Sequence, residues 1–197
     1  MDLGEILGRL TTFDLVVILF FIGFFILGFA QGTIRRVLGI ASVLFSFLFA
    51  ANLREPLGRF LAENWRQFPT EYSYMIGFLG VFIAATIAFT VTIQTFYKTQ
   101  PLFANARFAD ELLGGLLGIL QAFLFIAITL VILDSFYRVP GVPQSQGEVI
   151  FVRDFWNALN ESATAEFFRQ SVLPVFFTIV GLFIPNSIKF LFPDSAS

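Results

Sequence analysis

The chain has 197 residues, of which 57% are hydrophobic and only 13% are charged. An average soluble domain has about 45–50% apolar and about 25% charged residues, so the composition argues against an ordinary soluble globule. The 12 basic and 14 acidic residues leave a net charge of −2, which offers nucleic acid no general attraction. Cysteine and histidine are absent, which excludes thiol nucleophiles, imidazole metal ligands and histidine-based triads. We therefore expect no cofactor and no nucleic-acid partner.

The N-terminal segment predicts a short amphipathic helix that leads into a membrane. Its apolar residues recur at helical spacing with charged residues between them: Leu3, Ile6, Leu7 and Leu10. Residues 13–30 follow as an apolar stretch with only Asp14 at its edge. A bilayer core of about 30 Å needs roughly 20 such residues in a helix, so this stretch predicts a first membrane span.

Residues 33–52 predict a second span directly after the first. Its first turn contains Arg35 and Arg36, whose long side chains are expected to reach the lipid headgroups. Gln31 and Gly32 form the connection, and Gly32 is suited to end the first helix in a left-handed conformation. The two spans are therefore expected to form an antiparallel hairpin.

The middle of the chain predicts one interfacial helix and two further spans. Pro56 to Phe68 has apolar residues on one face and charged residues on the other, with Trp65 as an aromatic anchor at the membrane surface. Residues 72–97 lie between Glu71 and Lys98 without a charge, and residues 112–133 lie between Glu111 and Asp134 without one. Both stretches predict membrane-spanning helices.

The region after the fourth span is less apolar. Residues 138–149 contain two prolines and several polar residues, which is typical of a linker, and Phe151 to Phe168 mixes charged and aromatic residues as a surface helix does. Gln170 to Ile188 carries no charge, but its two prolines leave a short apolar core. We expect an interfacial or re-entrant helix there, with a fifth span as the alternative.

These elements together predict an all-α integral membrane protein. Its fold class is a four-transmembrane-helix bundle with interfacial amphipathic helices and a hydrophobic C-terminal helix. We expect residues 1–137 to form the membrane domain, residues 138–149 a linker, and residues 150–197 an amphipathic and interfacial C-terminal region.

Small residues at four-residue spacing occur on three of the predicted spans. The ridges contain Gly28 and Gly32, then Gly77, Gly80 and Ala84, and finally Gly114, Gly118 and Ala122. Such ridges let helix backbones approach closely in lipid, where packing replaces the hydrophobic drive. We interpret them as internal packing faces, with a face for self-association or a partner helix as the alternative.

Two aspartates, Asp14 and Asp134, lie at the ends of spans on the same predicted side of the membrane. We interpret Asp14 as a residue favoured by the helix dipole and Asp134 as an interfacial partner of Arg138. An intramembrane aspartyl protease also uses paired aspartates, but the Gly-x-Gly-Asp context of those enzymes is absent.

Two glutamines, Gln31 and Gln121, lie at or inside predicted spans. A buried amide in lipid must find a hydrogen-bond partner, so bonds between helices are the expected role. A polar lining for a substrate path is the alternative, although the spans contain almost none of the charged groups that most transporters use.

Two blocks of the sequence resemble the CvpA family, the colicin V production proteins of bacterial membranes. The first contains Asp14, an apolar run, and then Leu27 to Gly39 with Gln31, Arg35 and Arg36. The second is Ala109 to Ala122, which contains Asp110 and resembles the family's Asp-x-Leu-Leu-Gly-x-x-x-Gly-x-x-Arg-Gly. Many members have Arg, Arg and Gly at the positions of Gln31, Gln121 and Ala122. A third stretch, Ser171 to Pro174, resembles the family pattern less closely.

The resemblance implies a multi-pass protein of the bacterial cytoplasmic membrane that contributes to toxin production or export and to envelope homeostasis. It also implies no established catalytic residues and extracytoplasmic termini. We expect the protein to act by assembly with other membrane proteins or with itself. A small transporter or channel component is the alternative function. The loops at residues 31–36 and 98–111 hold their basic residues at the higher density, which favours the same orientation.

Overall fold

The computed structural model describes residues 11–96, 106–138 and 148–184. Four long helices dominate it: α2 (Thr12–Gln31), α3 (Thr33–Asn64), α4 (Thr70–Phe96) and α5 (Arg107–Tyr137). The described residues contain no strand, and each of these four helices includes a stretch long and apolar enough to cross a membrane. The predicted all-α membrane fold with four candidate spans is therefore confirmed.

The boundary between α2 and α3 follows from local chemistry. Thr11 caps α2 in a capping box, because its hydroxyl accepts from the Asp14 amide while the Asp14 carboxylate accepts from the Thr11 amide. Gly32 ends the helix with φ of 77°, a backbone angle that L side chains rarely adopt. The predicted break at Gly32 is observed.

The helix α3 does not end where the sequence suggests. We predicted an end near Asn52 and a separate interfacial helix from Pro56 to Phe68, and both expectations are wrong because one helix runs from Thr33 to Asn64 through Pro56. Proline removes a single helical hydrogen bond, which long helices packed against neighbours tolerate. Gly58, two residues later, is buried against the ring of Tyr74, so packing against α4 continues past the proline.

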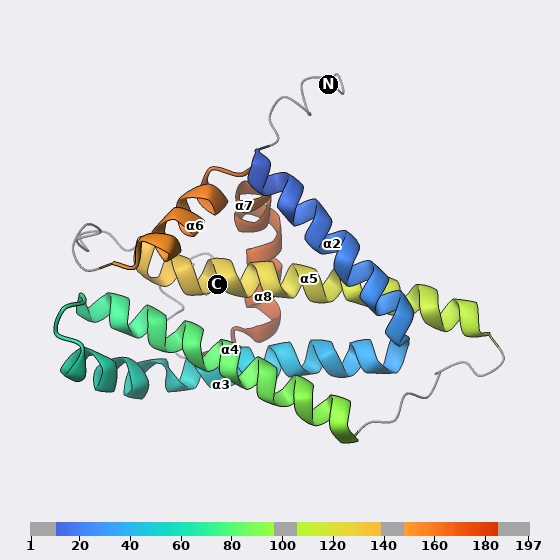
Figure 1. The fold of residues 1–197 in the computed structure, drawn as a ribbon, viewed down its shortest axis with the longest axis horizontal. Helices are drawn as coiled ribbons and strands as arrows, with labels where there is room; N and C mark the ends of the chain where they lie inside the picture. The colour runs from blue at the N-terminus through green and yellow to red at the C-terminus, as the bar shows by residue number, and fades with distance from the viewer. Residues whose placement is uncertain (1–10, 97–105, 139–147, 185–197) are drawn as a thin grey trace.

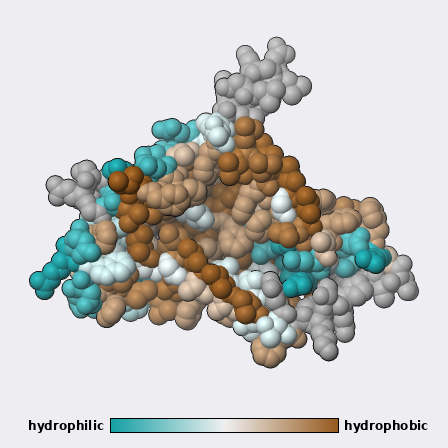
Figure 2. Space-filling view, in the orientation of Figure 1, coloured by the Kyte–Doolittle hydropathy of each residue, from teal (hydrophilic) through white to brown (hydrophobic). Residues whose placement is uncertain are grey.

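The four helices pack mainly as two antiparallel pairs, α3 with α4 and α2 with α5, and α5 also packs against α3. Figure 1 shows α2 and α4 on opposite sides of the central helix α5. The shared core contains large apolar side chains that are almost fully buried, among them Phe47, Phe78, Ile128 and Phe136. Figure 2 shows a hydrophobic surface over α2, with hydrophilic residues gathered toward the two ends of the bundle.

The C-terminal region folds back onto this bundle. It contains α6 (Ile150–Asn160), α7 (Ala163–Phe167), the π-helix η1 (Phe168–Val172) and α8 (Leu173–Val180). The predicted single surface helix from Phe151 to Phe168 is wrong, because the chain breaks at Glu161 and Ser162 then caps α7 by accepting from the Ala165 amide.

The apolar stretch that starts at Gln170 lies partly inside the core. Leu173 is fully buried, and the Phe176 ring lies 5.3 Å from the Phe47 ring of α3. Its helix α8 has eight residues, and it is not among the described helices that are long enough to span a membrane. The described part is therefore a fold-back segment. The predicted lead-in at residues 3–10, most of the linker, and residues 185–188 lie outside the described part of the chain.

Candidate functional site: polar and glycine contacts inside the bundle

The glycine ridge of α5 lies against α2. A Cβ atom on Gly114 would lie 2.5 Å from the Gly28 carbonyl oxygen and 3.0 Å from the Gly32 Cα, and one on Gly118 would overlap the Phe24 carbonyl oxygen. Ala122, at the end of the ridge, is fully buried. Gly28, Gly32, Gly114 and Gly118 therefore form a close helix crossing within this chain, which leaves the ridge no room for a helix of another protein.

The ridge on α4 is different. A Cβ atom on Gly77 would lie 3.3 Å from Leu61 of α3, whereas one on Gly80 would meet nothing within 4 Å. Gly80 is exposed on the surface of the bundle. Only part of this predicted ridge therefore packs against another helix of the chain.

Asp110 joins the two sequence blocks at the end of the bundle. Its carboxylate accepts from the Thr33 amide at 3.4 Å, and its backbone carbonyl accepts from the Thr33 hydroxyl at 2.9 Å. A Cβ atom on Gly32 would lie 2.5 Å from the other carboxylate oxygen, so a larger residue there would displace Asp110. A carboxylate at the start of α3 also interacts favourably with the helix dipole. Sequence spacing alone did not reveal this pair, which is 77 residues apart.

Arg36 and Gln121 form a polar pair inside the membrane domain. The guanidinium donates to the Gln121 side-chain oxygen at 2.8 Å and lies 5.7 Å from the centre of the Phe24 ring. Arg36 is only 5% exposed, so the expectation that it reaches the headgroups is wrong. Gln31 and the half-buried Arg35 line the same cavity, so the structure brings together four of the predicted polar residues.

Asp14 forms hydrogen bonds both at the start of α2 and with the C-terminal region. Besides its capping contacts, it accepts from the Thr164 amide at 3.0 Å and from the Thr164 hydroxyl at 2.7 Å. The side chain is almost fully buried, and these donors satisfy it. The sequence predicted the role of Asp14 at the helix start but gave no sign of the contact with Thr164, 150 residues away.

Asp134 is the second anchor of the C-terminal region. Arg169 donates to both of its carboxylate oxygens, at 2.9 and 2.8 Å, and the Trp156 indole donates at 3.2 Å. The predicted partner Arg138 is present, but its nitrogen is 3.9 Å away and its side chain is half exposed. The principal partner is therefore Arg169, which the π-helix carries and which sequence analysis missed.

The two aspartates act on neighbouring parts of one segment and not on each other. Asp14 bonds α7, whereas Asp134 bonds η1 and α6, and no hydrogen bond in the described part of the chain joins the two carboxylates. The described residues also contain no cluster of acidic side chains that could hold a metal ion. Each carboxylate joins the C-terminal region to one of the long helices.

Residues 13–173 match the family model described as Colicin V production protein. The chain belongs to the colicin V production protein family. The match includes the four long helices and extends through α6, α7 and η1. No curated protein and no solved structure matches the chain. Family membership and the four candidate spans together identify a multi-pass membrane protein of the colicin V production type.

Proposed function

We propose that the protein is a non-enzymatic component of the bacterial cytoplasmic membrane that supports toxin production or export and envelope homeostasis by assembling with other membrane proteins. The observation that carries this proposal is the family match over residues 13–173. The buried aspartates support the non-enzymatic part, because Asp14 and Asp134 each accept several hydrogen bonds that position the C-terminal region. The family is not known as a family of enzymes.

The packing of α2 on α5 limits which surfaces of the protein are free to contact a partner. The glycine ridge of α5 is occupied by α2, so a partner must use another face. The outer face of α2 offers exposed apolar side chains, among them Leu15, Leu19 and Ile26, which are 54%, 67% and 59% exposed. In a bilayer such a face accommodates either lipid or a partner helix at a similar cost.

Membrane crosslinking in living cells tests assembly. A photoreactive amino acid at Leu19 should capture a distinct membrane protein in a strain that the modified gene complements. The matched position is Leu116 on α5, which is 51% exposed on a different helix. A complementing, abundant protein that crosslinks to no other protein from either position would contradict assembly.

We also propose that the termini are extracytoplasmic and that the loops at residues 31–36 and 98–111 are cytoplasmic. The density of basic residues in those loops supports this orientation. A reporter active only in the periplasm should be active when fused after Gln67 and silent when fused after Ala104. The reverse pattern would overturn the orientation.

A small transporter or channel component is the second candidate, and one observation favours it. Gln31, Arg36 and Gln121 line a common cavity of about 230 Å³ between the helices. A transport role predicts solute flux in vesicles that contain the purified protein, and loss of that flux in Gln121→Leu. Absence of flux for both proteins would leave assembly as the function.

A further inference from the structure

A cavity beside Arg36 is lined in part by polar side chains, although the surrounding bundle is apolar. All four long helices contribute to it, and its polar lining consists of Gln31, Arg35, Arg36, Ser42, Thr90 and Gln121. Two of these side chains are cations and the other four are neutral. The lining therefore carries positive charge and contains no carboxylate.

Arg36 is the most unusual group in this lining. Its side chain is almost fully buried, and in the described part of the chain the Gln121 oxygen is the one polar group that it bonds. Its Nε atom is buried without a hydrogen-bond partner, and no described carboxylate forms an ion pair with it. A buried arginine is costly unless an anion compensates it. Its free donor and its charge both suit an anionic ligand.

Gln121 and Gly39 hold this arginine in position. The Gln121 amide lies directly over Gly39, where a Cβ atom would come within 3.1 Å of both amide heteroatoms. A larger residue at position 39 would press on this amide, which fixes one arm of the guanidinium through the 2.8 Å bond. A guanidinium fixed in this way is suited to bidentate recognition of a phosphate group.

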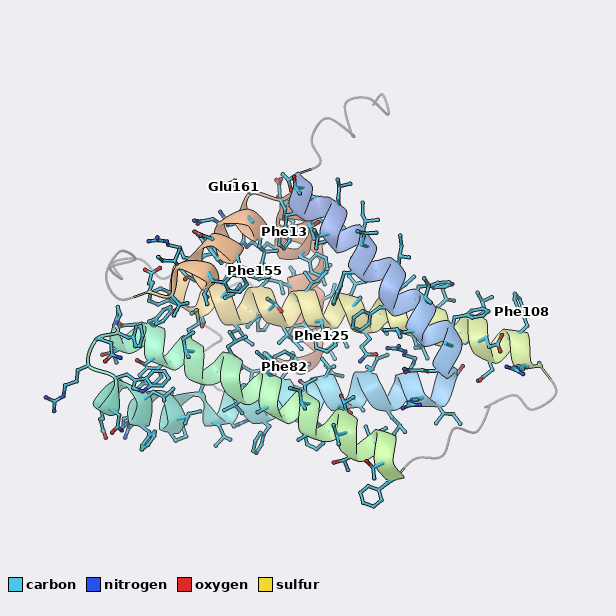
Figure 3. The ribbon with its side chains drawn as sticks, in the orientation of Figure 1. Phe13, Phe82, Phe108, Phe125, Phe155 and Glu161 are labelled. Atoms are coloured by element: carbon cyan, nitrogen blue, oxygen red, sulfur yellow. The ribbon has the colours of Figure 1, made fainter. Side chains whose placement is uncertain are left out.

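The surroundings of the cavity favour a ligand that is partly apolar. Leu27 of α2, which is 50% exposed, and Ile93 of α4 also line it, and α2 and α4 barely contact each other. The cavity is therefore lined by two helices that make few contacts with each other. Phe125, labelled in Figure 3, also lines a second, mostly apolar cavity of about 340 Å³ together with Phe13 and Phe155. A phosphate with attached hydrocarbon chains matches this combination better than free phosphate does.

We propose that the cavity binds the phosphate group of an anionic phospholipid between α2 and α4, with Arg36 and Arg35 as its cationic contacts and Gln121 as the residue that positions Arg36. Basic pockets between membrane helices are a known way of recognising anionic headgroups. This inference does not rest on the proposed assembly function, because lipid retention is measured on the purified protein.

Native mass spectrometry of the detergent-purified protein tests the proposal. The native chain should retain phosphatidylglycerol after washing, whereas Arg36→Gln should retain at least fivefold less. The matched control is Arg107→Gln, since Arg107 lies on the same end of the bundle with its side chain 86% exposed and paired to Glu111. Equal retention by the native chain and Arg36→Gln, or no retention by the native chain, would overturn the proposal.

Two further measurements keep the test decisive. Should Arg36→Gln not fold, Gln121→Leu removes the oxygen to which Arg36 donates while all charges stay intact. It should lower phosphatidylglycerol retention, whereas Arg107→Gln should retain as much as the native chain. Delipidated native protein should show a higher thermal midpoint with short-chain phosphatidylglycerol than with short-chain phosphatidylcholine or inorganic phosphate. An equal shift with inorganic phosphate would overturn the lipid assignment, and an equal shift with phosphatidylcholine would overturn recognition of negative charge.

Discussion

The crossing of α2 over α5 and the attachment of the C-terminal region are held by different physical means. At the crossing, Gly28, Gly114 and Gly118 bring two backbones together, so the contact depends on the absence of side chains. The C-terminal region packs apolar side chains into the core and is attached in addition by hydrogen bonds to two buried carboxylates, Asp14 with Thr164 and Asp134 with Arg169. The first kind of contact is broken by added volume, and the second by lost charge or a lost donor.

The largest effect is expected from Gly118→Leu at the crossing. The new side chain would overlap the Phe24 carbonyl, a backbone atom that cannot move without separating the helices. We expect a loss of about 3 kcal/mol in the free energy of unfolding, at the upper end of the usual cost of overpacking. Thermal unfolding in detergent, followed by tryptophan fluorescence, measures this loss. Gly80→Leu is the control, because a Cβ atom on Gly80 meets nothing within 4 Å.

A smaller effect is expected from Asp134→Asn at the second region. The substitution removes the carboxylate that Arg169 binds at two oxygens. Arg169 keeps its 2.8 Å bond to Asn160 and remains partly exposed, so we expect a loss of about 2 kcal/mol, less than for a fully buried pair. Asp154→Asn on the exposed surface of α6 should change the thermal midpoint very little. Equal midpoints for these two variants would show that the Asp134 contact does not hold the C-terminal region.

Thr164→Val sharpens the comparison by removing one donor without changing side-chain shape. The Thr164 hydroxyl donates to Asp14 at 2.7 Å, while its amide would still donate at 3.0 Å. We expect a loss of about 1.5 kcal/mol, at the lower end for a hydrogen bond to a charged group, because the amide bond remains. During heating, proteolytic cleavage in the segment after α5 should become faster at a temperature where the contact of α2 with α5 is still intact. Thr178→Val is the matched control, because the Thr178 hydroxyl bonds the Pro174 carbonyl within its own helix.

The smallest effect concerns pH and Glu148, just ahead of α6. Burial raises the pKa of the Glu148 carboxyl above its ordinary 4.5, and this outweighs the lowering by Arg153 and by the Tyr137 hydroxyl. The folded state therefore binds the proton more tightly than the unfolded state. This contribution to stability is fully present below pH 4.5 and is lost as the pH rises through the raised value.

Glu148→Gln should remove that part of the pH dependence and slightly raise the thermal midpoint at neutral pH. Identical pH profiles for the native chain and Glu148→Gln would contradict the assignment.

The two regions also differ in how far the sequence predicts them. The spans and the glycine crossing follow from local patterns: charge-free stretches, a glycine at position 32, and small residues four apart. The pairs Asp14 with Thr164 and Asp110 with Thr33 lie 150 and 77 residues apart, and only the fold brings them together. Pro56 misled the prediction because its local tendency to end a helix is outweighed by continued packing against α4.

The central claim is that the α2 and α5 crossing forms within one chain. The natural sequence has no cysteine, so paired substitutions report on it cleanly. Phe21→Cys with Phe123→Cys places two thiols on these helices where the rings are 4.8 Å apart. Membranes that contain tagged and untagged copies are treated with a short bismaleimide. We expect a crosslink inside single chains. Crosslinks that join tagged to untagged copies while single chains stay unlinked would contradict a crossing within one chain.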